Sequence, residues 1–111
     1  MEDKRAVKRH NLYSSVWVRD GGSGIELGQV YDISVHGAQV VGNEPFEKGR
    51  TYKLQLELPE EILGKKEALL DALCVWASRD LNPSYFKAGF RFVDRGTFIE
   101  SIVGLIHEYT L

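Results

Sequence analysis

The chain is poor in residues that cross-link or interrupt a fold, with one cysteine, one methionine and three prolines in 111 residues. A single cysteine, Cys74, excludes an intramolecular disulfide framework and suits a reducing compartment, so we expect a cytoplasmic location. No apolar run approaches the roughly 18 to 20 residues of a membrane span, and residues 1–5 lack the apolar core of a secretory signal. We therefore expect neither membrane insertion nor export.

A large excess of either charge is also absent, because 14 Lys and Arg stand against 16 Asp and Glu, for a net charge of -2. So small a total does not predict long-range attraction to nucleic acid or to an anionic membrane. At 111 residues, 43% of them hydrophobic, the chain is long enough for one domain with a modest core and too short for two.

Basic side chains nevertheless gather at the start of the chain: Lys4, Arg5, Lys8, Arg9 and His10. Few apolar side chains accompany them, so this segment has little to bury against a core. We expect residues 1–11 to form a flexible basic arm and residues 12–111 to form the folded domain.

Alternating hydrophobic and polar residues predict strands in much of the chain. The alternation is strict over residues 52–58 and 86–93, which is typical of half-buried strands. Shorter strands are expected at about 12–19, 25–33 and 39–41, and the glycine-rich run from Gly21 to Gly24 predicts a hairpin loop between the first two. Together these strands predict an antiparallel barrel or sandwich.

Two later segments differ in how clearly they predict a structure. Residues 65–77 are ambiguous, because residues 67–73 favour a helix whereas residues 74–76 favour a strand. Near the end, Thr97 followed by Glu100 is a capping-box pattern, which predicts the start of an amphipathic helix packed on the strands. The apolar stripe of this helix consists of Phe98, Ile99, Ile102, Val103, Leu105, Ile106 and Tyr109.

Two arginines of the basic arm, Arg5 and Arg9, have the spacing RxxxR. A guanidinium presents a rigid fork of donors that binds a phosphate or the O6/N7 edge of guanine, so two of them suit a phosphorylated guanine ligand. The alternative is a solvated basic tail, since this spacing arises by chance in about one chain in four of this length. The motif alone therefore does not decide a function.

A second motif, DxSxxG, closes the strand expected at 25–33 and consists of Asp32, Ser34 and Gly37. The carboxylate can accept hydrogen bonds from N1 and N2 of guanine, and the hydroxyl can bond a base edge or a phosphate. Glycine permits a positive φ and the close approach of a ligand. The same residue types form ordinary turns, but the pattern arises by chance in only about three chains per hundred, so it carries more information than the first motif.

Found in this order, with the arm before one strand and the turn after the next, the two motifs resemble those of the PilZ family. The similarity extends over essentially the whole chain, since residues 89–94 resemble the late strand of that family and a C-terminal helix is expected after them. The resemblance implies an all-β fold with a C-terminal helix, a six-stranded antiparallel β-barrel of the split-barrel type. It also implies that residues 72–77 form a strand.

The resemblance implies a ligand as well, the bacterial second messenger cyclic di-GMP. Arg5 and Arg9 are implied to clamp a guanine edge and the phosphodiester. Asp32 and Ser34 are implied to hold a guanine on the barrel surface beside Gly37.

Three further residues are candidates for the same ligand. Trp76 stands where some family members place a tryptophan against a guanine, and an ordinary core tryptophan is the equal alternative. Lys4 precedes the arginine motif, where in similar domains an arginine accompanies a stacked ligand dimer and an apolar residue accompanies a single ligand. Lysine fits neither pattern, so the stoichiometry stays open with a lean to the dimer. Lys8 lies inside the motif and adds positive charge.

The implied role is that of a receptor or adaptor whose arm becomes ordered over the ligand and whose new surface docks on an effector protein. Two alternatives stay open. One is a small barrel that binds single-stranded nucleic acid through its arm and exposed aromatic residues, which the net charge of -2 disfavours. The other is a PilZ-like protein-interaction module that does not bind the ligand.

The sequence does not predict an enzyme, a cofactor or a metal site. Ser34 and His36 are too close along a strand end to form a nucleophile and base pair, and no glycine-rich phosphate loop is present. His10, His36 and His107 have no cysteine or carboxylate at the spacing that zinc requires.

Overall fold

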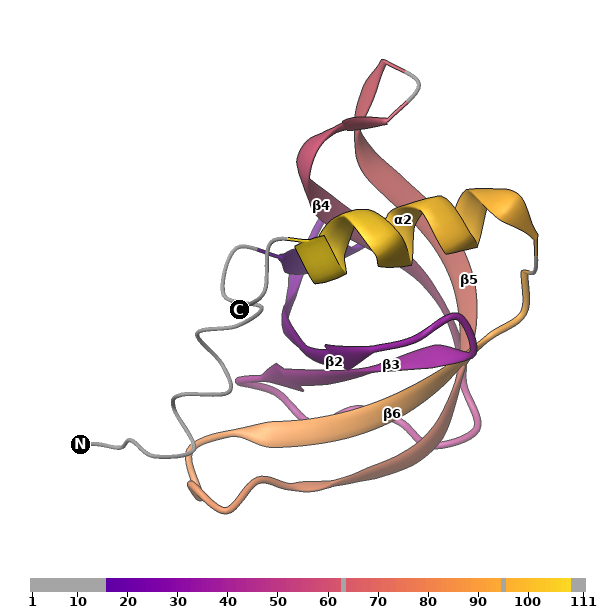
Figure 1. Cartoon of the computed structure of the whole chain (residues 1–111). Helices are drawn as coiled ribbons and strands as arrows, with labels where there is room; N and C mark the ends of the chain where they lie inside the picture. The colour runs from indigo at the N-terminus through magenta and orange to yellow at the C-terminus, as the bar shows by residue number, and fades with distance from the viewer. Residues whose placement is uncertain (1–15, 63, 95, 109–111) are drawn as a thin grey trace.

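The computed structural model describes residues 16–62, 64–94 and 96–108. The elements are β1 (Trp17–Asp20), β2 (Glu26–Ile33), β3 (Gly37–Gly42), β4 (Thr51–Ile62), β5 (Lys65–Arg79), β6 (Phe86–Phe92) and α2 (Thr97–Glu108). The strands form a closed antiparallel barrel in the order β1-β2-β3-β6-β5-β4, with β4 pairing back onto β1 (Figure 1). The predicted six-stranded barrel with a C-terminal helix is confirmed.

The longest hairpin joins β4 and β5, which pair from Thr51 opposite Leu73 to Glu57 opposite Glu67. Buried side chains alternate along both strands: Tyr52, Leu54, Leu56 and Leu58 in β4, and Ala68, Leu70, Ala72 and Cys74 in β5. The helical alternative for residues 65–77 is therefore wrong. These helix-forming residues adopt a strand because β4 and β6 form hydrogen bonds with their backbone. Side chains that alternate along the strand also bury one of its faces.

The predicted boundaries of the shorter strands hold to within a few residues. β2 begins at Glu26, one residue later than expected, and β3 is longer than expected because all six of its residues pair with β6. β1 is described from Trp17, and the expected start of this strand at residues 12–15 lies outside the described residues.

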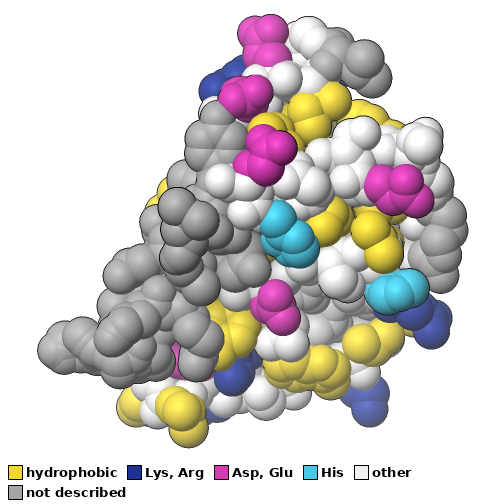
Figure 2. Space-filling model, viewed as in Figure 1, with side chains coloured by type: hydrophobic (Ala, Val, Ile, Leu, Met, Phe, Trp, Pro, Cys, Tyr) yellow, Lys and Arg dark blue, Asp and Glu magenta, His cyan; other side chains and the backbone are white. Residues whose placement is uncertain are grey.

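The end of the β4–β5 hairpin extends beyond the barrel (Figure 1). Acidic side chains gather over this projection in the space-filling view (Figure 2). Its polar residues, which include Glu60, Glu61, Lys65 and Lys66, are exposed to solvent.

The helix α2 completes the core beside β4. Ile99, Ile102, Val103 and Ile106 of the predicted stripe are buried, whereas Phe98 is 42% exposed. The Glu100 amide donates to the Gly96 carbonyl at 3.2 Å, so Gly96 occupies the cap position, one residue before the predicted Thr97. No polar side chain is buried in the described ranges, and no helix there is long and apolar enough to cross a membrane.

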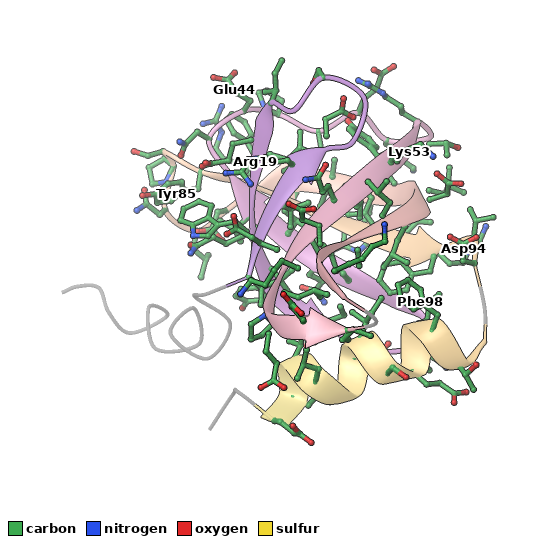
Figure 3. All side chains as sticks on the ribbon, turned by 90° about the horizontal axis from the view of Figure 1, so that it is seen from above. Arg19, Glu44, Lys53, Tyr85, Asp94 and Phe98 are labelled. Atoms are coloured by element: carbon green, nitrogen blue, oxygen red, sulfur yellow. The ribbon has the colours of Figure 1, made fainter. Side chains whose placement is uncertain are left out.

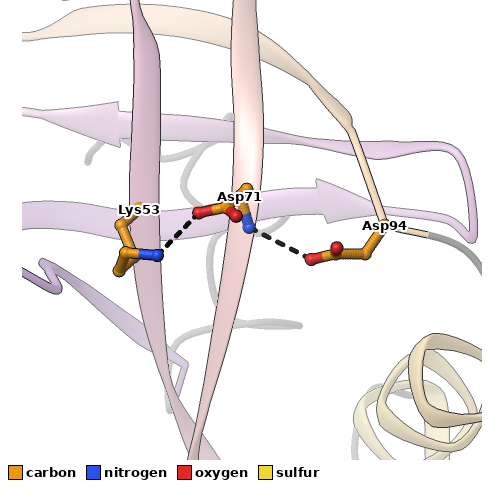
Figure 4. A network of polar contacts seen from close by, with 3 residues as sticks. All are labelled: Lys53, Asp71 and Asp94. Carbon is orange, nitrogen blue, oxygen red and sulfur yellow. Dashed lines mark hydrogen bonds and ion pairs between the residues drawn. The ribbon is translucent and has the colours of Figure 1, made fainter.

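Three polar residues tie the strands to the connection that leads into α2. The ammonium group of Lys53 lies 2.9 Å from the Asp71 carboxylate, and the Asp71 amide donates to the Asp94 carboxylate at 3.3 Å (Figure 4). The Val93 amide donates to the Asp71 carbonyl at 2.9 Å.

Seen from above, Asp94 and Phe98 lie on the side of α2, whereas Glu44 and Tyr85 lie on the opposite side of the molecule (Figure 3).

The predicted hairpin loop between β1 and β2 is confirmed. The Asp20 carboxylate accepts hydrogen bonds of 2.9 Å from both the amide and the hydroxyl of Ser23, and the Gly24 amide donates to the Asp20 carbonyl at 2.7 Å. Gly24 has a φ of 78°, a conformation that glycine adopts without strain. The bonds from Ser23 lower the pKa of the Asp20 carboxyl below its ordinary value of 3.8.

Replacing Asp20 is therefore expected to alter stability in acid. The folded protein binds this proton less tightly than the unfolded chain, so the ionised carboxylate stabilises the fold above about pH 4, and this contribution is lost as the pH falls through the lowered pKa. Asp20→Asn should lower the free energy of unfolding at neutral pH and make it fall less steeply below about pH 4, in urea titrations. The exposed Glu44→Gln serves as control, and identical acid dependence in wild type and Asp20→Asn would contradict this role.

Candidate functional site

An irregularity in β2 places Asp32 on the outside of the barrel. Val30 pairs with Val40 of β3, and Asp32 pairs with the next residue, Gln39, so two residues of β2 are matched to one of β3. Regular alternation from the buried Val30 would turn Asp32 into the core. The bulge instead leaves Asp32 exposed and returns Ile33 to the core.

A second bulge does the same for Trp76 in β5. Cys74 is buried and pairs with Phe90, whereas Trp76 pairs with the adjacent Gly89. The extra residue in β5 turns the indole outward, and Trp76 is 36% exposed. The core alternative for this tryptophan is therefore wrong.

The two bulges align four side-chain positions in one row across four strands. Asp32 of β2 pairs with Gln39 of β3, Gln39 pairs with Gly89 of β6, and Gly89 pairs with Trp76 of β5. All four line a shallow outer pocket of about 280 Å³. Exposed hydrophobic side chains gather over β5 and β6, and a histidine and a Lys or Arg side chain lie together at the right edge of this face (Figure 2).

The DxSxxG turn forms one end of this pocket and is held by its own backbone. The Ser34 amide donates to the Gly37 carbonyl at 2.8 Å, and the Ser34 hydroxyl accepts from the His36 amide at 3.1 Å. The Phe92 amide donates to the His36 carbonyl at 2.9 Å, which joins the turn to β6. The β2–β3 connection is therefore a tight turn bonded to β6.

Gly37 does not have the positive φ that was one of the two reasons expected for a glycine here. The described glycines with positive φ are Gly24, Gly28, Gly49, Gly64 and Gly96. A β-carbon at position 37 would instead collide with the carbonyl oxygen of Phe90 in β6. Glycine here allows β3 to approach β6 closely at the edge of the pocket.

The polar groups of the turn retain capacity for a ligand. One Asp32 oxygen accepts from the Ile33 amide at 3.0 Å, which fixes the carboxylate and leaves its second oxygen as a further acceptor. The Ser34 hydroxyl, which accepts from His36, still has its own hydrogen to donate. An acceptor for base N–H groups and a donor for base or phosphate oxygens therefore stand side by side.

The position of the Trp76 indole depends on the absence of a side chain at residue 89. The indole covers Gly89, because a β-carbon built there would overlap Nε1 and the adjoining ring atoms of Trp76. The ring is thereby brought close to the barrel surface in the middle of the row. This position gives the pocket an aromatic wall at the end opposite Asp32.

The lining residues that the sequence-based prediction did not name include Gln39, Gly89 and Arg91. Gln39 and Gly89 lie between Asp32 and Trp76 in the row, and Arg91 pairs with Gly37. Arg91 carries the one guanidinium among the described residues that line the pocket. The strict alternation of residues 86–93 already placed Gly89 and Arg91 on the outer face, but nothing in the sequence indicated which turn they would face.

The helix α2 is bonded to the same turn from behind. A ring nitrogen of His107, Nε2, lies 2.9 Å from the Ile33 carbonyl oxygen. Ile33 stands between Asp32 and Ser34, so the last turn of α2 helps to fix the backbone of the motif. This contact gives His107 a structural role.

The structure thus brings together four of the eight predicted ligand residues: Asp32, Ser34, Gly37 and Trp76. The other four, Lys4, Arg5, Lys8 and Arg9, lie outside the described residues. Across residues 16–62, 64–94 and 96–108, no group of three or more His, Cys, Asp and Glu side chains is arranged to hold a metal ion.

A comparison with protein families matches residues 3–106 to the PilZ domain. The chain belongs to the PilZ domain family. PilZ domains are receptors for cyclic di-GMP or adaptors rather than enzymes, and the resemblance inferred from the two motifs is confirmed at the level of the family.

Solved structures support the PilZ fold. The structure of the Bacillus subtilis inhibitor of motility (MotI/DgrA) is similar, with a TM-score of 0.62 and 19% sequence identity, over 84% of this chain and 44% of that one. The chain therefore corresponds to less than half of that protein, and the similarity concerns the fold. A search of curated proteins found no match.

The two glycines of the PilZ pocket are expected to differ in their tolerance of alanine. Gly37→Ala forces a β-carbon against backbone and should destabilise the domain by about 1 to 3 kcal/mol, whereas Gly89→Ala displaces only a side chain and should cost less than about 1 kcal/mol. Urea unfolding measures both free energies. In a Trp17→Phe background, Gly89→Ala should also shift the fluorescence of Trp76, and an unchanged emission spectrum would show that the indole does not lie on Gly89.

Proposed function

We propose that this PilZ domain binds cyclic di-GMP in the pocket between the Asp32–Gly37 turn and Trp76, and that binding is relayed to an effector protein. The observation that carries the proposal is the row of paired residues, which assembles the DxSxxG motif, an exposed tryptophan and Arg91 in one pocket. The family match supports it, because it begins at residue 3 and includes both arginines of RxxxR.

Each group in the pocket suits one part of a guanine dinucleotide. The carboxylate of Asp32 accepts from N1 and N2 of guanine, which distinguishes guanine from adenine. The Ser34 hydroxyl donates to a base or phosphate oxygen. The indole of Trp76 offers a face on which a purine can stack, and the Arg91 guanidinium balances the charge of a phosphodiester.

Residues 1–11 supply the remaining positive charge in this proposal. Cyclic di-GMP carries two phosphodiester charges, whereas the described lining residues provide the Arg91 guanidinium against the Asp32 carboxylate. Arg5 and Arg9 close over the ligand and contribute the forked donors that phosphate and guanine bind. Lys4 and Lys8 add charge. Ordering the arm costs about 1 to 2 kcal/mol per residue in backbone entropy, so these contacts must exceed that cost.

The output of the domain is a new surface rather than a reaction. Once the arm lies over the ligand, the face around Trp76 presents groups that the unliganded domain does not present, and the effector recognises this combination. We place this exchange in the cytoplasm, because a chain with a single cysteine, Cys74, cannot form an intramolecular disulfide and suits a reducing compartment.

Calorimetric titration separates this function from its alternatives. Cyclic di-GMP should release or absorb heat with saturation at micromolar concentrations, whereas GMP, GTP and single-stranded DNA should bind much more weakly because none of them matches both ends of the pocket. No heat with cyclic di-GMP at tens of micromolar contradicts the proposal, and saturable binding of DNA alone would favour a nucleic-acid barrel.

Arg9→Ala should abolish binding of cyclic di-GMP while leaving the melting temperature nearly unchanged, because the arm contributes little to the core. The matched control is Arg50→Ala, which removes a guanidinium that lies over the Tyr52 ring on another part of the surface. If Arg9→Ala unfolds the domain, or if Arg50→Ala weakens binding equally, the assigned role of the arm is wrong.

Trp76→Leu should weaken cyclic di-GMP by roughly 5-fold to 150-fold, because stacking of a base on an aromatic side chain contributes about 1 to 3 kcal/mol. Trp17→Phe is the matched control, since Trp17 does not line the pocket. Calorimetry of both variants tests the assignment, and an unchanged affinity in Trp76→Leu shows that the indole does not contact the ligand.

A further inference from the structure

A second and larger groove lies apart from the cyclic di-GMP pocket. It has a volume of about 810 Å³ and is bounded by the start of β2, the end of β3, the β3–β4 connection and the β5–β6 connection. Glu44 and Tyr85, which line it, lie on the side of the molecule away from α2 (Figure 3). No residue lines both the groove and the pocket.

Hydrogen bonds hold both walls of the groove. In the β3–β4 connection, the Tyr52 hydroxyl accepts from the Glu47 amide at 2.9 Å, and the Gly49 amide donates to the Cys74 carbonyl at 2.8 Å. In the β5–β6 connection, the amide of Asp80 donates to the carbonyl of Tyr85 at 2.9 Å. The walls are therefore formed before any partner binds, which lowers the entropic cost of binding.

Apolar side chains are exposed along this groove. Ile25 is 66% exposed and Tyr85 is 38% exposed, and both line it together with Trp17. Leu81, between two lining residues of the β5–β6 connection, is 89% exposed. Exposed apolar groups gathered on fixed walls are typical of a surface that a protein partner covers.

The charge of the groove is acidic. Three carboxylates line it against one guanidinium, and Asp80 is already engaged by the Lys87 ammonium at 3.7 Å. The Arg50 guanidinium lies over the Tyr52 ring, 4.5 Å from its centre. Glu26 and Glu44 are exposed, and neither forms an ion pair within the described part of the chain. The free charge available to a ligand is therefore negative, which disfavours nucleic acid and anionic lipid.

Backbone forms part of the floor. Gly28 and Gly42 line the groove, and a β-carbon at either position would collide with a carbonyl oxygen of the neighbouring strand, of Val41 and Leu27 respectively. Since β2 and β3 are both paired within the closed barrel, a partner cannot add as a further strand here. It must bind through its side chains.

We propose that this groove docks an extended segment of a protein partner in which aromatic or aliphatic side chains alternate with lysine or arginine. The apolar side chains pack on Ile25, Trp17 and Tyr85, while the cations reach Glu26 and Glu44. The inference rests on the proposed function in one respect, since the groove adds a second docking surface for the effector that recognises the liganded face around Trp76. The docking contacts themselves do not require cyclic di-GMP.

Amide NMR of the full chain tests the groove with two defined probes, a short peptide that alternates lysine with tryptophan and the same peptide with glutamate in place of lysine. The lysine peptide should shift the amide signals of Trp17, Ile25 and Tyr85 in a saturable manner, and the glutamate peptide should not. Shifts elsewhere on the barrel, or equal shifts with both peptides, overturn the proposal.

Charge reversal provides the matched comparison. The double variant Glu26→Lys, Glu44→Lys should weaken the lysine peptide about tenfold, because two exposed attractions become repulsions. Glu60→Lys, Glu61→Lys makes the same change in net charge on the β4–β5 hairpin and should alter the affinity less than about twofold. Equal weakening by the two double variants contradicts a specific groove. Glu26→Gln, Glu44→Gln provides the same test if charge reversal unfolds the domain.

The same samples identify other occupants. If the groove signals shift with protein concentration in the absence of peptide, a second copy of the chain occupies the groove. If the peptide binds only after Lys4, Arg5, Lys8 and Arg9 are replaced by alanine, the chain's own first residues occupy it. Either result contradicts an external partner. Cyclic di-GMP should shift the amide signals of residues 32–37, which do not line the groove. The receptor function and the docking groove are therefore tested independently.

Discussion

The candidate site depends on two β-bulges, one in β2 and one in β5. At each bulge, one extra residue changes which side chains face the core. In β5, Cys74 and Trp76 pair with adjacent residues of β6, so Cys74 stays in the core while Trp76 turns outward. In β2, Val30 stays in the core while Asp32 turns outward. Without these bulges, regular alternation would place a carboxylate and an indole inside the barrel. The uncompensated burial of that carboxylate would oppose folding.

The two strands between Asp32 and Trp76, β3 and β6, complete the site because each has a glycine where a side chain would collide. Gly37 allows β3 to approach β6, and Gly89 makes room for the Trp76 indole. The inner side of the same strands is packed with aromatic rings: Phe90 meets Phe46 and Tyr52 edge to face, with ring centres 5.7 and 5.3 Å apart. Phe90 also lines the candidate pocket, and Phe46 and Tyr52 line the acidic groove. One aromatic cluster therefore supports both surfaces.

Prediction from the sequence succeeded where a local pattern had one dominant cause. The alternation in residues 52–58 and 86–93 reflects a half-buried strand wherever it is placed, and the apolar stripe of residues 99–106 reflects a helix that covers a core. It was undecided for residues 65–77, whose helix formers at 67–73 are held in a strand by partners ten or more residues away in the sequence. It was wrong about a positive φ at Gly37, and it did not predict that a carbonyl of β6 excludes a side chain there.

The sequence by itself determined the family, the strand content and the three pocket residues of the DxSxxG turn, because this turn and the alternation are local patterns that can be recognised from residue type and spacing along the chain. Only the tertiary structure decided that Trp76 is outside the core, that Gln39, Gly89 and Arg91 join the pocket, and that an acidic groove lies apart from it. These features arise from the register between strands distant in sequence, and a one-residue shift in register moves a side chain from one face of a sheet to the other.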